Sequence, residues 1–296
     1  MSVAQNPQEG TTPLEPPAAR AKTHGSAPSE TQPTTGHPAG SRSSLVSDTL
    51  AVFQREMYLV LRDPFSVIFS LVQPLVFLGL FGTLLAGSID PAVIGGGSPL
   101  QWFLPGVIVM ICLFGTGVAG SNLLFEITLG SYERVLASPL RRSSILIGKS
   151  LKELAPLVVQ AALVTVVCIP FGFVLYPLHV LVGLLILGVF GVGMGAFSNA
   201  LAVAVRKREW MFWAVQQSLL FPLLILSGML LPLEAGPRWI QILGRFNPLT
   251  WVVDAERALF AGSWTDPAIG WAALAAVLTC VSGLWVGVRQ VQRSTT

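Results

Sequence analysis

The chain has 296 residues, of which 52% are hydrophobic and only 11% are charged. Soluble domains carry roughly 25% charged residues, so this composition argues against an ordinary soluble globular protein and indicates an integral membrane protein. The net charge of +3 does not predict a nucleic-acid partner, because the basic residues lie beside apolar blocks instead of forming one stripe.

Residues 1–44 differ from the rest of the chain. They are rich in Pro, Ser, Thr, Gly and Ala and contain almost no large apolar side chains. Such a segment buries too little surface to offset the chain entropy lost on folding, so it is predicted to be a disordered tail before a transmembrane domain at residues 45–296. It lacks the apolar run of a secretory signal, which predicts that it is retained on the cytoplasmic side.

An amphipathic helix is predicted next. Apolar residues recur there at helical spacing and charged residues lie on the other faces, before Pro64 stops or bends the helix. The residues concerned are Leu50, Phe53, Met57 and Val60, with Arg55 and Arg62 among the charges. We expect this helix to lie along the cytoplasmic membrane interface. A juxtamembrane continuation of the first span is the alternative.

Six apolar stretches follow, each near the length of about 20 residues that a helix needs to cross a hydrocarbon core of roughly 30 Å. Their approximate bounds are 67–86, 103–125, 154–175, 180–205, 211–231 and 268–288. The sequence therefore predicts an all-α integral membrane protein with six transmembrane helices. Gly191, Gly193 and Gly195 offer a small-residue face for close helix packing within the fourth stretch.

Lys and Arg are distributed unevenly around these stretches. Fifteen of the 18 fall in the N-terminal tail, the loops after the second and fourth spans, and the C-terminus. Because cytoplasmic loops carry an excess of Lys and Arg, both termini are predicted to be cytoplasmic in a multi-pass plasma-membrane protein. No Asp, Glu, Lys, Arg or His lies in the middle of a span, which argues against a proton- or sodium-coupled carrier.

The loop between the second and third spans ends in Gly148-Lys149-Ser150, a triplet found in phosphate loops. A phosphate loop also requires a Gly five residues earlier, where this chain has Ser143. The chain is therefore predicted to have no ATPase site. Its three cysteines, Cys112, Cys168 and Cys280, lie in apolar stretches, which argues against a zinc cluster, and no metal site or directly bound cofactor is predicted.

The same loop is longer than a connection demands. Residues 126–136 are expected to form a short helix that Ser138 and Pro139 end. Such a helix would present Glu133, Arg134 and Leu136 to a docking protein. A solvated linker is the alternative.

Two features remain near the fifth span. Gln216 and Gln217 are its most polar side chains, and together with Phe221 they are candidates for a translocation path. A hydrogen bond to a neighbouring helix is the alternative role for the two glutamines. After this span, no single helix can continue through Asn247-Pro248, so an external re-entrant or surface-lying pair of short helices is expected there.

Three stretches share their order and expected membrane sides with a known family. They are LRDPFSVIFSLVQPLVFLGLFG at 61–82, GSYERVLASPLRRS at 130–143 and NPLTWVVDAERALF at 247–260. They resemble, in turn, the entry into the first span, the cytoplasmic loop and the segment before the last span of type-2 permeases of ATP-binding-cassette (ABC) exporters, particularly the daunorubicin-resistance-like branch. The resemblance covers residues 46–290.

The resemblance implies a role for each predicted element. The amphipathic helix becomes the connecting helix, and the loop becomes a coupling helix that seats on a separate ATPase subunit through Glu133, Arg134, Leu136, Ser138 and Pro139. The segment with Asn247, Pro248, Asp254 and Arg257 becomes an external re-entrant element over the exit.

By the same resemblance, two permease subunits, identical or related, assemble with two ATPase subunits that bind ATP and Mg. The complex would export a hydrophobic or amphipathic small molecule (a drug, natural product or lipid) across the plasma membrane by alternating access. A permease for a polysaccharide or lipid-linked polymer is one alternative. An ATP-independent membrane anchor or assembly protein is another.

Overall fold

The computed structural model describes residues 45–293, with gaps at 63, 89–97 and 137–140. The predicted tail, Ser138 and Pro139 lie outside the described residues. Within the described part the regular structure is entirely helical. In chain order the elements are α1 (Leu45–Arg62), α2 (Pro64–Ser70), α3 (Val72–Ser88), α4 (Pro99–Thr128), α5 (Ser131–Leu136), α6 (Arg142–Lys152), α7 (Leu154–Cys168), the 3-10 turn η1 (Ile169–Phe171), α8 (Pro177–Ala204), α9 (Glu209–Ile225), the 3-10 turn η2 (Leu233–Ala235), α10 (Arg238–Phe246), α11 (Pro248–Phe260) and α12 (Pro267–Arg293).

Four helical stretches are long and apolar enough to cross a membrane: Pro99–Thr128, Arg142–Phe171, Pro177–Ala204 and Pro267–Arg293. They cover the expected second, third, fourth and sixth spans. The second of these stretches runs through α6, α7 and η1 with little interruption.

The other two expected spans fall on shorter helices. The first lies across α2 and α3, which a turn at Leu71 separates, and the fifth lies on α9. Helix α9 ends at Ile225, before the expected bound at Leu231. The chain then turns at Gly228, whose φ of 71° is a left-handed conformation that stops a right-handed helix. Whether α3 and α9 cross the membrane stays a prediction.

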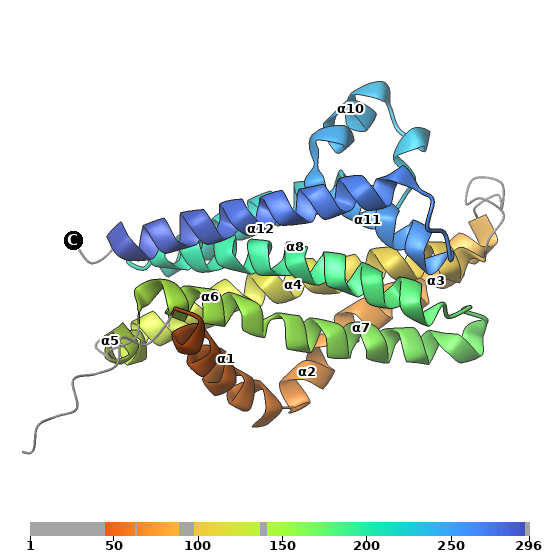
Figure 1. Ribbon diagram of the computed structural model, residues 1–296. Coiled ribbons are helices and arrows are strands. Elements are labelled where there is room, and N and C mark those ends of the chain that lie inside the picture. Colours follow the sequence, from red (N-terminus) through yellow and green to blue (C-terminus); the bar gives the residue numbers. More distant parts are fainter. Residues whose placement is uncertain (1–44, 63, 89–97, 137–140, 294–296) are drawn as a thin grey trace, which may run out of the picture. The chain divides into compact units, whose positions relative to one another are not determined.

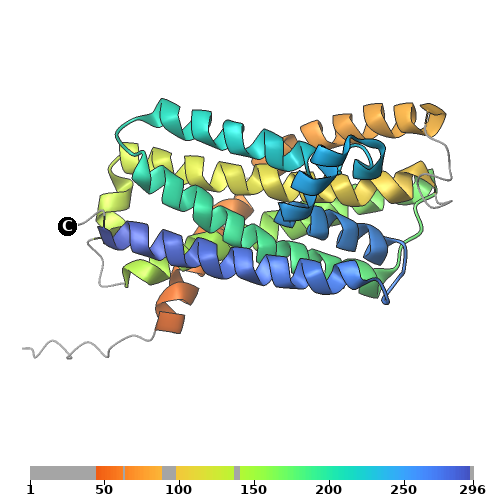
Figure 2. The same ribbon diagram turned by 90° about the horizontal axis from the view of Figure 1, so that it is seen from above.

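Helix α8 packs along α4 on one side and α12 on the other, and the shorter α11 packs against all three (Figures 1 and 2). Every residue of α4 from Phe103 to Leu113 is buried. A helix that is apolar on all sides and buried on all sides is surrounded by other helices, so α4 belongs to the interior of the helix bundle.

The two ends of the bundle differ in charge. One end of the bundle, here called the basic end, contains helix α5, the end of α12, and the turn between α8 and α9 with Arg206-Lys207-Arg208 (Figures 1 and 2). The turn between α7 and α8 and the start of α12 lie at the other end, here called the opposite end.

Glycine makes the contact between α8 and α12 possible. The backbone of Gly193 on α8 lies against Thr279 and Gly283 on α12, and a Cβ added at Gly193 would lie 2.6 Å from the Thr279 carbonyl oxygen. Real Cβ atoms essentially never approach this closely. The small residues of the fourth apolar stretch therefore allow the two backbones to touch, as small residues do between membrane helices.

Replacing Gly193 by Val should separate α8 from α12. Overpacking of a tight contact costs about 1–3 kcal/mol, and a clash with backbone belongs at the upper end of that range. Thermal unfolding of the purified protein in detergent measures the effect. The matched control is Gly270→Val on α12, where an added Cβ meets no atom within 4 Å. Equal unfolding temperatures for the two variants would contradict this account of the packing.

Candidate functional site

Five charged side chains from three parts of the chain meet near the basic end. They form the charged cluster, which consists of Glu56 on α1, Glu126 on α4, Lys149 and Lys152 on α6, and Glu153 directly after α6. These helices meet because the buried face of α1 packs on α6, and α6 in turn continues into the stretch that packs beside α4 and α8.

Lys149 is the centre of the cluster. Its ammonium donates to Glu56 Oε1 at 2.9 Å and to Glu126 Oε1 and Oε2 at 2.6 and 2.8 Å. The side chains of Lys149 and Glu56 are only 5% and 2% exposed, so both charges are shielded from water. Lys152 donates to the second oxygen of Glu56 at 3.2 Å. Glu56 therefore accepts from two lysines at once.

The electrostatics of Glu56 follow from this arrangement. Burial by itself raises the pKa of a carboxyl group, but the charges and hydrogen bonds of Lys149 and Lys152 outweigh burial, and the pKa of Glu56 lies below its ordinary value. The carboxylate is therefore ionised at neutral pH and the ion pairs are real charge pairs.

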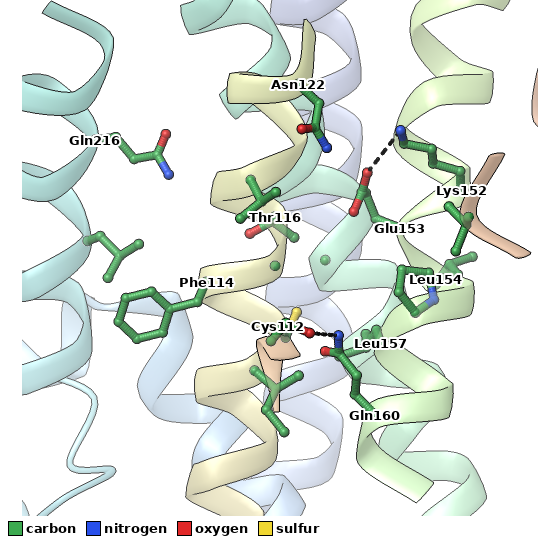
Figure 3. A pocket seen from close by; sticks show the side chains of 18 of the residues that line it. Cys112, Phe114, Thr116, Asn122, Lys152, Glu153, Leu154, Leu157, Gln160 and Gln216 are labelled. Carbon is green, nitrogen blue, oxygen red and sulfur yellow. Dashed lines mark hydrogen bonds and ion pairs between the residues drawn. The ribbon is translucent and has the colours of Figure 1, made fainter. Parts of the chain in front are cut away.

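A cavity of about 710 Å³ adjoins the charged cluster. Its walls come mainly from α4, α7 and α9, with residues of α1, α2, α3, α6 and α8 completing them. Figure 3 shows Thr116 and Asn122 of α4 opposite Lys152 and Glu153, with Gln160 further along α7 and Gln216 pointing toward them from α9. Most of the remaining lining is apolar, so the cavity has a charged end and largely apolar walls.

Gln160 closes one side of this cavity. Its Nε2 donates to Ser70 Oγ at 2.6 Å, which connects α7 to α2. The hydrogen bond satisfies a buried amide and holds the two helices together at the cavity wall.

The predicted path residues separate into two groups. Gln216 and Gln217 line the cavity, whereas Phe221 lies outside the lining with its ring half exposed. A role of any of the three in translocation stays a prediction.

The helix predicted before the first span is present as α1, but the protein buries a different face of it than its apolar pattern suggested, and its role as a connecting helix stays a prediction. Asp48, Val52 and Glu56 are buried, and this face packs on α6. The apolar residues Leu50, Phe53, Met57 and Val60 are exposed or half-buried, and Arg55 and Arg62 are exposed. The sequence pattern of α1 did not indicate that Glu56 is buried, because the two lysines that bind its carboxylate lie on α6.

The helix predicted in the loop after the second span is shorter than expected, and its role as a coupling helix stays a prediction. Helix α4 ends at Thr128 and α5 begins at Ser131, so the expected continuous helix over residues 126–136 is wrong. Gly130, with φ of 69°, makes the break because it adopts a conformation that other residues avoid. Glu133, Arg134 and Leu136 lie on α5, where Arg134 is exposed while Tyr132 and Val135 are buried.

The segment before the last long helix forms α10 and α11, which meet at Asn247-Pro248. Asn247 caps α11 by accepting from the Leu249 N–H at 3.0 Å and donates to the Leu223 carbonyl at 2.7 Å. Arg257 stacks over the Trp102 ring at 3.7 Å and donates to the carbonyls of Gly228 and Met229 at 2.9 and 3.1 Å. Asp254 lies 3.7 Å from Arg257.

Glu256 is a residue that the sequence analysis did not single out. It is 1% exposed, packs toward Gly183 of α8, and neither carboxylate oxygen has a hydrogen-bond partner in the described part of the chain. Its spacing from Val252 and Phe260 places it on the buried face of α11, and this periodicity is the signal that would have identified it.

The cluster itself had no comparable signal in the sequence. Glu56 and Lys149 are 93 residues apart, and Glu126 and Lys149 are 23 apart. Lys149 and Lys152 are three residues apart on α6, so the sequence alone places these two lysines on the same face of a helix. The Gly-Lys-Ser triplet lies inside α6, with Lys149 bound to carboxylates, so it forms no phosphate loop.

The sequence matches a known protein family over most of its length. Residues 47–261, most of the described helices, match the model of the ABC-2 type transporter family. The chain belongs to the ABC-2 type transporter family. The permease is 30% identical over 219 residues to a protein of Cyanophora paradoxa named as the transport permease ycf38, covering 73% of this chain and 75% of that one.

Two further relatives carry names that refer to drugs. The daunorubicin resistance ABC transporter permease protein DrrB1 of Streptomyces coeruleorubidus is 29% identical over 224 residues, covering 75% of this chain and 78% of its own length. A protein of Escherichia coli strain K12, named as the multidrug ABC transporter permease YbhR, is 25% identical over 162 residues, covering 54% and 44%.

The family membership confirms the resemblance drawn from the sequence. The permease is a multi-pass membrane protein and a transport subunit, and ATP hydrolysis belongs to a separate ABC ATPase subunit. The prediction that this chain does not itself hydrolyse ATP is confirmed.

The charged cluster predicts a large effect of removing its centre. Lys149→Met removes one of the two ammonium groups that bind the buried carboxylate of Glu56 and also breaks the contact with Glu126, and breaking a buried ion pair by removing one partner costs about 3–5 kcal/mol. Thermal unfolding in detergent should show this loss. The double variant with Glu56→Gln should recover part of it, because the buried carboxylate that has lost one of its two cations is then neutral.

Lys207→Met is the control, since Lys207 is exposed in the turn between α8 and α9. Surface changes of this kind stay within about 0.5 kcal/mol. If Lys149→Met and Lys207→Met unfold at the same temperature, the cluster does not stabilise the fold.

Proposed function

We propose that the permease is the membrane subunit of an ABC exporter that moves a hydrophobic or amphipathic small molecule out across the plasma membrane. The observation that carries this proposal is the cavity of about 710 Å³ between α4, α7 and α9. Pockets for small molecules have volumes of about 300–1,000 Å³ and combine apolar walls with few polar groups. The drug-related names of two relatives support the same substrate class.

The cavity size favours a small molecule over a polymer. A polysaccharide channel would be expected to place aromatic rings along its wall, whereas the lining here has only Phe114, Phe125 and Trp213 as aromatic residues among the described ones. An ATP-independent anchor has no evident use for such a cavity. The family membership also favours a transport subunit over an anchor.

The contacts between helices support a route by which a docked ATPase subunit would move the helices that line the cavity. Arg134 is exposed on α5, which packs against the end of α4, and α4 carries both Glu126 of the charged cluster and one wall of the cavity. Movement of α5 by a docked ATPase subunit is thereby passed to α4 and, through Lys149, to α6 and α1. Such a device needs two states that nucleotide binding biases.

The proposed complex contains two permeases and two ATPase subunits, and the ATPase subunits bind ATP and Mg. Six helical stretches cross the membrane, α3 and α9 among them, and the basic end of the bundle faces the cytoplasm, so both chain termini are proposed to be cytoplasmic. The excess of Lys and Arg at that end supports this orientation. The exposed apolar face of α1 is then free to lie in the lipid interface as a connecting helix.

Cysteine labelling tests the orientation and the passage of α9 through the membrane. Cys112, Cys168 and Cys280 are first replaced by Ala, and single cysteines are placed at Lys207 and Arg245, which lie before and after α9. A membrane-impermeant maleimide added to intact cells should label position 245 and should reach position 207 only after the cells are opened. Labelling of both positions from outside, or the reverse pattern, contradicts the proposal.

Transport itself is tested by co-reconstituting the permease with its ABC ATPase in vesicles. ATP should drive movement of a hydrophobic fluorescent dye across the membrane. Arg134→Glu should lower this transport at least tenfold, because a repelled ATPase no longer moves α5, while the amount of inserted permease stays normal.

Arg245→Glu is the matched control, since Arg245 is equally exposed but lies on α10, in the segment that the proposed orientation places outside. It should leave transport unchanged. Dye movement that needs no ATPase, or that survives Arg134→Glu at the normal rate, would refute the proposed function.

A further inference from the structure

The charged cluster is not electrically balanced. It holds three carboxylates (Glu56, Glu126 and Glu153) and two ammonium groups (Lys149 and Lys152). The cluster therefore has one carboxyl group more than it has ammonium groups, beside the cavity.

The geometry assigns that surplus to one residue. Glu56 accepts from both lysines at 2.9 and 3.2 Å, and both oxygens of Glu126 accept from Lys149. The nearest ammonium to Glu153 is that of Lys152 at 3.9 Å, which is too long for a hydrogen bond. Lys152 gives its short contact to Glu56 instead.

Glu153 also faces the cavity. Its side chain is 13% exposed, and it is part of the lining, opposite Thr116 and Asn122 of α4 (Figure 3). A carboxylate that is largely removed from water but not matched by a bonded cation attracts a positive charge more strongly than a surface carboxylate does, because the effective dielectric constant is lower.

The remainder of the cavity wall suits the apolar part of a ligand. Ile111 and Phe114 of α4, Leu157 of α7 and Leu220 of α9 line the same cavity. A molecule that carries a single positive charge and an apolar body satisfies both the carboxylate and these side chains. An anionic molecule would lie beside the carboxyl group of Glu153, where the nearby ammonium of Lys152 is already bonded to Glu56.

We propose that the cavity binds amphiphiles with one positive charge and that Glu153 is the residue that selects them by holding the cationic group. This inference rests on the proposed function, because it takes the cavity to be the substrate site. It adds the substrate's charge and the residue that recognises it.

The experiment compares two probes of nearly equal size and opposite charge, tetraphenylphosphonium and tetraphenylborate. Equilibrium dialysis measures their binding to the full-length permease in detergent, with protein-free micelles subtracted and no ATPase present. Tetraphenylphosphonium should bind at least tenfold more tightly than tetraphenylborate. Glu153→Gln should weaken tetraphenylphosphonium binding about tenfold and remove the preference.

Three further variants make the outcome decisive. Glu153→Asp keeps the carboxylate and should keep the preference for the cation. Leu157→Trp fills the cavity and should abolish binding of both probes. Glu209→Gln removes an exposed carboxylate outside the cavity, one that accepts from Thr128 at 2.8 Å, and should change neither affinity.

Equal binding of the two probes to the unaltered permease overturns the inference, and this comparison does not depend on whether any variant folds. Unchanged tetraphenylphosphonium binding in Glu153→Gln also overturns it, provided that the variant elutes as a single species in size-exclusion chromatography. ATP-driven export without preference for cations would leave the proposed function standing and remove this inference. Selective cation binding without ATP-driven export would do the reverse.

Discussion

The ammonium group of Lys149 holds together three helices that are far apart in the sequence. It donates to Glu56 of α1 and Glu126 of α4 from its own position on α6, and all three contacts are 2.9 Å or shorter. A buried charge of this kind is tolerated only while its partners stay in place. The position of α1 against α6, and of both against the end of α4, is therefore fixed by electrostatics as well as by packing.

After the end of α9, one charged side chain again satisfies polar groups that come from other parts of the chain, and here these groups are backbone carbonyls. Helix α9 stops at Ile225, and the irregular backbone that follows has carbonyl groups without helical partners. Arg257 of α11 donates to two of them, at Gly228 and Met229, while its guanidinium lies on the Trp102 ring. Irregular backbone near a membrane persists only where protein satisfies its polar groups, and here one arginine does so.

Between these two regions, packing leaves both close contacts and a cavity. Glycines bring α8 and α12 into backbone contact, and α4 is enclosed over its middle turns. The space beside α4, α7 and α9 is not filled, and the charged cluster forms one end of it. The region proposed to move with a docked ATPase and the region proposed to hold a substrate thus share residues, since Glu56, Glu126, Lys152 and Glu153 belong to both the charged cluster and the cavity wall.

The sequence by itself determined the membrane class, the family and the position of most helices, because apolar length, glycine and proline act locally along the chain. It also excluded a phosphate loop at Lys149 from the spacing of a single glycine. It did not determine the charged cluster or the face of α1 that packs on α6. Those were decided by tertiary structure, since a charge such as Glu56 can be buried only where residues 93 positions away supply its partner, and that proximity is a property of the folded chain.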